Sequence, residues 1–169
     1  MVTNPAMTVT LHPATPDDEP VLRRLLELYR HDFSEVDGAD LDERGLFGYP
    51  YLDRYWTEPD RSAFLLRVEG RLAGFVLVNG HTYTDEGERA VAEFFVVRKY
   101  RRRGVGRRAA IAVFERIPGV WEVPVRAANA AAHAFWRAAI EAAVGAAYDL
   151  VQHEAWPGSI FRFTAGSSG

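Results

Sequence analysis

Residues 90–108 read AVAEFFVVRKYRRRGVGRR, and this stretch indicates the fold. Residues 91–97 are almost entirely apolar, which is typical of a central strand that is buried on both faces. A very basic turn follows, and Gly104 lies where we expect a helix to begin. Seven basic residues and no acidic residue lie from Arg98 to Arg108. The stretch therefore predicts a strand, a cationic turn and a helix.

The cationic turn has the chemistry of an anion-binding site. A helix start carries about half a positive charge and several unpaired backbone N–H groups, which suit a phosphate. Gly104 and Gly106 have no side chain that would keep a phosphate away from those groups. The pattern favours a phosphate cradle, although a tight turn with solvated arginines fits the same residues.

The whole chain has the composition of one globular domain. It has 169 residues, and we expect a core over about residues 8–164 with a disordered tail at 165–169. It lacks cysteine, which excludes disulfides and is compatible with a reducing cytosol. The first ten residues do not resemble a signal peptide, and no apolar run reaches the length of a membrane span. The five histidines lack metal-ligand spacing. We therefore expect a cytoplasmic protein with no membrane partner and no metal.

The remaining pattern predicts an α/β (α+β) fold. Strands are expected at 8–12, 62–69, 72–79, 90–97, 120–126, 148–154 and 159–164, and helices at 15–32, 104–117 and 129–145. This order gives a mostly antiparallel central sheet with one parallel crossover, flanked by helices. Pro124 has no N–H to donate, so strand 120–126 is not expected to pair along its full length with strand 90–97.

Two kinds of anion, a dinucleotide and a nucleic acid, fit the cradle only in part. Gly104–Ala109 matches the dinucleotide pattern G-x-G-x-x-G/A, and Glu122 lies about where a ribose-binding acid is expected. However, an antiparallel hairpin precedes the motif, whereas a dinucleotide fold begins with it. Nucleic acid is disfavoured by the net charge of −3 and by the lack of aromatic residues other than Tyr100 in the basic run.

Two motifs together resemble the GCN5-related N-acetyltransferase (GNAT) family, over about residues 8–164. The family signature Arg/Gln-x-x-Gly-x-Gly/Ala corresponds to Arg101–Gly106, which follows a strand as in the family. A second family element, an Asn-x-x-Ala helix with an aromatic pair, corresponds to Asn129–Ala132 followed by Phe135 and Trp136. The resemblance implies a GNAT-like sheet in which the two parallel central strands splay apart.

The resemblance also implies that the chain binds acetyl-CoA as an acyl donor. The pyrophosphate would lie on backbone N–H groups of about 101–107, and the pantetheine arm would pair with the backbone of 95–97 like an added strand. The implied contact residues are Phe95, Val96, Val97, Arg101, Arg102, Arg103, Gly104, Val105, Gly106, Arg107, Asn129, Ala132 and Trp136. Independently of the family, Asn129 is a helix cap and Trp136 has the spacing of a core residue.

The implied reaction is direct attack of a primary amine, on a small or peptide acceptor, on the thioester in a ternary complex. In the family the acceptor lies near the region that residues 32–58 occupy here. Six acids and five aromatic residues of this segment suit a cationic amine, although they also fit a solvated loop. The acids are Asp32, Glu35, Asp37, Asp40, Asp42 and Glu43. Glu93, the one acid of the central strand, is either the general base or the structural partner of an arginine.

The proton donor for the departing thiolate is not evident from the sequence. The family often has a tyrosine where this chain has Trp136, and an indole cannot donate that proton. Tyr148 and His133 are candidates, and a thiol with a pKa of about 8.5 can also leave without help. A non-catalytic acyl-CoA-binding or regulatory domain therefore stays open as the alternative. The acceptor, the acyl length and the oligomeric state, with a homodimer among the options, are not determined.

Overall fold

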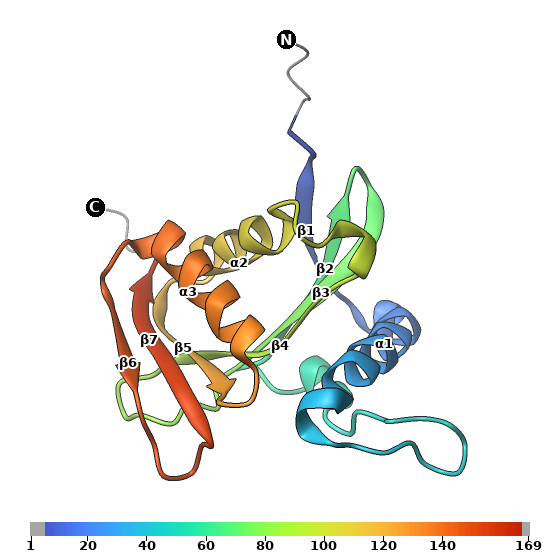
Figure 1. Cartoon of the computed structure of the whole chain (residues 1–169). Helices are drawn as coiled ribbons and strands as arrows, with labels where there is room; N and C mark the ends of the chain where they lie inside the picture. The colour runs from blue at the N-terminus through green and yellow to red at the C-terminus, as the bar shows by residue number, and fades with distance from the viewer. Residues whose placement is uncertain (1–5, 167–169) are drawn as a thin grey trace.

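A seven-stranded sheet forms the centre of the computed structural model, which describes residues 6–166 (Figure 1). The strands are β1 (Val9–Pro13), β2 (Ser62–Val68), β3 (Arg71–Asn79), β4 (Arg89–Val96), β5 (Gly119–Arg126), β6 (Tyr148–Val151) and β7 (Gly158–Ala165). Their order in the sheet is β1-β2-β3-β4-β5-β7-β6, and every neighbouring pair is antiparallel except β4 and β5. The predicted mixed, mostly antiparallel sheet is thus confirmed.

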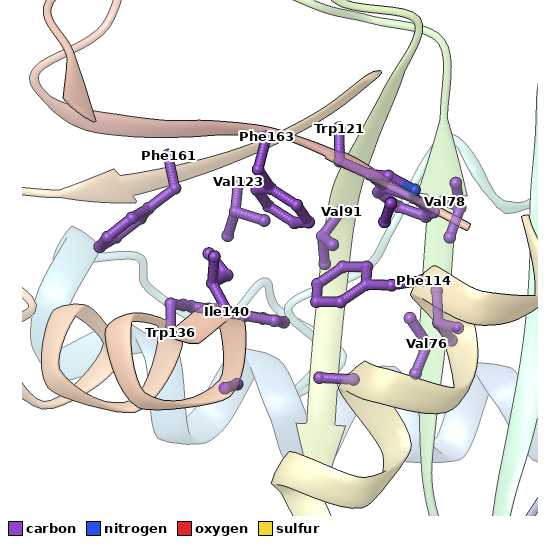
Figure 2. Close-up of a cluster of buried hydrophobic side chains, with 14 of the residues drawn as sticks. Val76, Val78, Val91, Phe114, Trp121, Val123, Trp136, Ile140, Phe161 and Phe163 are labelled. Atoms are coloured by element: carbon purple, nitrogen blue, oxygen red, sulfur yellow. The ribbon is translucent and has the colours of Figure 1, made fainter. Parts of the chain in front are cut away.

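Helices cover both faces of this sheet (Figure 1). The α-helices are α1 (Glu19–Asp37), α2 (Val105–Arg116) and α3 (Ala130–Val144), and the 3-10 helices are η1 (Pro16–Asp18), η2 (Leu52–Trp56) and η3 (Arg98–Tyr100). α2 and α3 bury Phe114, Trp136 and Ile140 on one face, as Figure 2 shows, against strand residues such as Trp121 and Phe161. α1 and η2 bury Leu22, Leu26 and Leu52 on the other face. The two cores are therefore separated by the sheet.

Helix α1 is one turn longer than the sequence predicted. It was expected to end near Asp32, but it continues to Asp37 and ends at Gly38, which has a left-handed φ of +71°. The extra turn continues the apolar face of the helix, because the rings of Tyr29 and Phe33 stack at 5.6 Å. Three predicted acceptor residues, Asp32, Glu35 and Asp37, therefore lie on a helix.

The central parallel strands separate soon after they meet. β4 pairs with β5 at two positions, Arg89 with Trp121 and Ala90 with Glu122. Beyond them β5 pairs only with β7, and this register runs through Pro124 opposite Ile160. The splayed arrangement that the GNAT resemblance implied is confirmed. The missing N–H of Pro124 removes a donor from the β5 backbone where β4 departs.

The C-terminal hairpin differs slightly from the prediction. β6 ends at Val151 rather than near residue 154, and β7 continues through Ala165, whose side chain is buried. Ala165 is therefore part of the sheet and not of the predicted tail. Residues 167–169 of that tail lie outside the described residues.

Candidate active site

A cleft of about 630 Å³ lies where β4 and β5 splay apart. Phe94 of β4 and Val125 of β5 line its two sides. Asn129 and Trp136 of α3 line it on one face of the sheet, and Tyr29 of α1 lines it on the other. The cleft therefore connects the two faces, so that a donor and an acceptor could meet in it from opposite sides.

Glu93 lines the cleft from the middle of β4. The β3–β4 register shifts opposite Leu77 and Val78, so the regular ladder is interrupted beside Glu93. Burial raises the pKa of the Glu93 carboxyl to about 7, although the hydroxyls of Tyr29 and Tyr49 and the charge of Arg30 act in the opposite direction. A carboxyl with this pKa exchanges protons readily near neutral pH, as a general base requires.

Two tyrosines and an ion pair surround this carboxyl. Burial and the charge of Glu93 raise the pKa of both Tyr29 and Tyr49, so both phenols stay protonated near neutral pH. Arg30, whose Nη1 lies 3.0 Å from Oδ2 of Asp37, is held by that acid and not by Glu93. The sequence-based alternative of a salt bridge between Glu93 and an arginine is therefore not what the structure contains.

The basic turn leads from the end of β4 into α2. Gly104 is the N-cap of α2 with a φ of +75°, and no atom lies within 4 Å of the position that a Cβ would occupy there. The first four N–H groups of the helix, from Gly104 to Arg107, have no partner within the helix. The open space and the free N–H groups fit a phosphate.

Gly106 has a different role from the one that the sequence suggested. A Cβ at Gly106 would lie 3.0 Å from Cε2 of Phe135, whose ring packs on those of Phe94 and Trp136. The missing side chain therefore allows α2 to pack closely against α3. Gly104, and not Gly106, leaves open space at the basic turn.

The arginines of the turn divide into two groups. Arg98 and Arg101 both form ion pairs with Asp32 of α1, and Arg101 Nε also donates to the Val96 carbonyl at 2.7 Å. These bonds lower the pKa of Asp32 against the raising effect of its burial. Within residues 6–166, no side-chain hydrogen bond or ion pair was found for three exposed arginines: Arg102, Arg103 and Arg107. These three side chains are available to a phosphate at the rim.

The edge of β4 beside the cleft is formed by Phe94 and Val96, of which Val96 is among the predicted residues 95–97. The Val97 N–H donates to the Ala73 carbonyl at 2.8 Å, so Val97 and, by alternation, Phe95 direct their polar backbone groups toward β3. The backbone of Phe94 and Val96 faces the splayed side. An added strand would therefore pair with these two residues, and Arg101 already occupies the Val96 carbonyl.

The predicted residues of α3 meet at the cleft. Asn129 caps the helix, because its Oδ1 accepts a hydrogen bond from the Ala132 N–H at 3.0 Å. The Trp136 indole is 7% exposed and packs edge-to-face on Phe94 at 4.9 Å. Asn129, Ala132 and Trp136 all line the cleft, and Trp136 also belongs to the core.

The two candidate proton donors lie elsewhere. Tyr148 of β6 pairs with Phe163 of β7, which in turn pairs with Trp121 near the start of β5. The Tyr148 hydroxyl donates to Glu141 at 3.0 Å. His133 packs on Phe161 at 5.0 Å between ring centroids. Neither residue is among those that line the cleft. The structure therefore does not bring the predicted base, Glu93, together with either candidate proton donor.

The acids of residues 32–58 are not gathered around the cleft either. Asp32 is bound to arginines of the basic turn, and Asp42 binds Arg44 and the N–H groups of its own turn. Among the six acids only Asp37 lines the cleft, and it is paired with Arg30. The expected attraction of a cationic acceptor by this segment loses its main support.

Glu122 is structural, although it is fully buried. Its carboxylate accepts hydrogen bonds from the N–H groups of Tyr83 and Thr84 at 2.6 and 3.0 Å and from the Thr84 hydroxyl. It thereby ties the loop before β4 to β5, at the position where these strands are still paired.

Several residues of the cleft had no signal in the sequence. Tyr83 and Trp156 come from two different loops, and their rings meet at 5.5 Å. The Arg126 guanidinium lies 5.4 Å from the centroid of the Trp156 ring. All three line the cleft. Their proximity depends on the loop before β4 and the β6–β7 loop lying together, which no local pattern reveals.

Within residues 6–166, no helix is long and apolar enough to cross a membrane. The same residues contain no cluster of three or more histidine or acidic side chains that could hold a metal ion.

Comparisons with solved structures show the same fold at low sequence identity. An acetyltransferase from Thermus thermophilus is 21% identical with a TM-score of 0.69, over 94% of this chain and 98% of that one. The PaiA N-acetyltransferase from Thermoplasma acidophilum, in complex with coenzyme A, is 10% identical with a TM-score of 0.58, over 94% and 99%. An aminoglycoside acetyltransferase from an uncultured soil metagenomic sample, in complex with sisomicin, is 15% identical with a TM-score of 0.60, over 86% and 93%.

The sequence comparisons identify the family. No curated protein matched the chain in sequence. Residues 22–139, however, match the family described as the Acetyltransferase (GNAT) family. This segment includes most of α1, the splayed strands β4 and β5, the basic turn and most of α3, and so contains both motifs of the sequence resemblance. The chain therefore belongs to the acetyltransferase (GNAT) family.

Proposed function

We propose that the protein transfers an acetyl group from acetyl-CoA to a primary amine. The observation that carries this proposal is the position of Glu93 in a cleft between two splayed strands, with a pKa near neutrality. The cleft opens on both faces of the sheet, so a thioester and an amine can approach one another beside this carboxyl.

The residues of this chain fit an acyl-CoA. The open left-handed position at Gly104 and the N–H groups that start α2 would hold the pyrophosphate. Arg102, Arg103 and Arg107 would contact phosphate at the rim. The backbone of Phe94 and Val96 would pair with the amide groups of the pantetheine arm, at a Val96 carbonyl that already accepts one hydrogen bond from Arg101.

Glu93 would act as the general base. An alkyl ammonium has a pKa near 10 and must give one proton to solvent before it can attack, which leaves Glu93 ionised for the second proton. The amine nitrogen then bonds to the thioester carbonyl carbon, the carbon–sulfur bond breaks, and the second amine proton passes to Glu93. The thiolate leaves as the anion or takes a proton from water, because its pKa of about 8.5 makes it a tolerable leaving group.

Thiol release from acetyl-CoA in the presence of a panel of amines tests the proposal. We expect release that depends on the amine and that falls by about 100-fold or more in Glu93→Gln. Glu115→Gln, an exposed change on α2, is the matched control and should retain full activity. Calorimetric binding of CoA without turnover of any amine would instead favour the non-catalytic acyl-CoA-binding domain.

A further inference from the structure

The cleft of this protein carries more positive than negative side chains. Four arginines line it, namely Arg30, Arg54, Arg61 and Arg126, but only two acids do, Asp37 and Glu93. Since the pKa of Glu93 is raised to about 7, this acid supplies less than a full negative charge near neutral pH. A site of this charge is not suited to a polycationic acceptor.

Two of the four arginines are neutralised by the protein. Arg30 is paired with Asp37 at 3.0 Å. Arg61 is paired with Glu58 at 2.5 Å, and its Nη2 lies 2.8 Å from Nε2 of His81. Because a guanidinium can only donate, His81 accepts this bond on Nε2. Neither arginine therefore needs a charge from a ligand.

The other two arginines have little or no compensation. Arg54 reaches the already paired Glu58 only at 3.9 Å. Arg126 is half-buried, and no acidic partner was found for it within residues 6–166. A half-buried charge without a counter-charge is unfavourable, so Arg126 in particular calls for an anionic partner.

Aromatic rings hold both guanidinium groups in place. Arg54 lies over Tyr51 at 5.3 Å and Arg126 over Trp156 at 5.4 Å, and both rings also line the cleft. Stacking on an aromatic ring leaves the donating edge of the planar guanidinium free. That edge matches the two oxygens of a carboxylate.

We infer that the acceptor is an amine that also carries a carboxylate, which Arg126 binds with support from Arg54, while its amino group faces Glu93. A carboxylate fits better than a doubly charged phosphate, because a single arginine here lacks any counter-charge. This inference rests on the proposed acetyl transfer, and it concerns the charge of the acceptor and not the reaction.

Matched pairs of amines test the inference through thiol release from acetyl-CoA. Each pair is an amino acid and its decarboxylated amine, L-lysine with cadaverine and L-phenylalanine with phenethylamine. We expect kcat/KM to be about tenfold or more higher for the amino acid in each pair, as a charge-assisted hydrogen bond provides. O-phosphoethanolamine against ethanolamine reports whether a phosphate serves equally well.

Variants of Arg126 link that preference to the residue. Arg126→Gln should reduce the preference for the amino acid to about twofold or less and leave turnover of the decarboxylated amine intact, which also shows that the variant is folded. Arg126→Lys should retain part of the preference, and Arg24→Gln, an exposed charge change on α1, should retain all of it.

The outcomes separate the two proposals. Equal or greater turnover of the decarboxylated amines by the wild type overturns the inference, and so does an unchanged preference in Arg126→Gln. Phosphoethanolamine turned over as well as the amino acids overturns the choice of a carboxylate. Release with none of these amines, while CoA binds, counts against the proposed acetyl transfer itself.

Discussion

Glu93→Gln should make the protein more stable at alkaline pH while it abolishes the general base. The Glu93 pKa is raised from 4.5 to about 7 by burial, so the folded protein binds this proton more tightly than the unfolded chain does. The ionised carboxylate therefore disfavours folding as the pH rises above 4.5, and this effect levels off above pH 7. Glutamine cannot ionise and lacks this penalty.

The size of the effect follows from the two pKa values. Ionisation of Glu93 costs the folded state about 1 kcal/mol at pH 5 and about 3 kcal/mol at pH 8. The free energy of unfolding of Glu93→Gln, relative to the wild type, should therefore increase by about 2 kcal/mol between these values. Any change in packing caused by the amide is the same at both pH values and cancels in this comparison.

Urea unfolding of both proteins at pH 5 and pH 8 measures this difference. Glu115→Gln, at an exposed position of α2, serves as the control and should differ from the wild type equally at both pH values. A difference between Glu93→Gln and the wild type that does not change with pH would refute the reasoning. Glu93 would then not be a carboxyl of raised pKa, and its assignment as the base would lose its physical basis.

Three further properties can each be tested separately: the pH dependence of turnover, CoA binding by the basic turn, and the stabilising role of the buried Glu122. With an amine acceptor, kcat/KM should fall as the pH decreases through an apparent pKa of about 7, because Glu93 becomes protonated. This decrease should be missing in Glu93→Gln. In calorimetry, Gly104→Val should weaken CoA binding more than tenfold, because a β-branched residue disfavours the left-handed conformation. Arg102→Ala should weaken CoA binding only a few-fold. Equal losses of affinity in the two variants would show that the charge of the arginines, and not close approach to the backbone, provides the binding. In urea titrations, Glu122→Ala should lower the free energy of unfolding by about 3 kcal/mol or more, because it leaves buried N–H groups unpaired. Glu86→Ala, at an exposed position, should change this free energy by about 0.5 kcal/mol or less.

Local sequence patterns were sufficient for most of the fold. The alternation of the strands, the apolar spacing of the helices and the caps at Gly104 and Asn129 act within a few residues along the chain. The last turn of the helix, which ends at Asp37, was not predicted. The ring of Phe33 extends the apolar face by stacking on Tyr29, and one such residue among polar neighbours does not by itself indicate a further helical turn.

The sequence by itself determined the basic turn with its glycine N-cap and the separation of the parallel strands. Both depend on residue types whose backbone properties are independent of their surroundings. Gly104 tolerates a left-handed φ, the helix that follows leaves its first N–H groups unpaired, and Pro124 lacks a donor. The structure therefore contains these backbone features at the positions that the sequence indicates.

The tertiary structure alone decided the chemistry and the charge of the cleft. The raised pKa of Glu93 depends on its burial beside Tyr29 and Tyr49. Asp32 forms ion pairs outside the cleft, whereas Arg126 lies over the ring of Trp156 and lines the cleft with it. Burial and ion pairing act through space between residues that are far apart in the chain, so counting acids in one segment could not predict the charge that an acceptor meets.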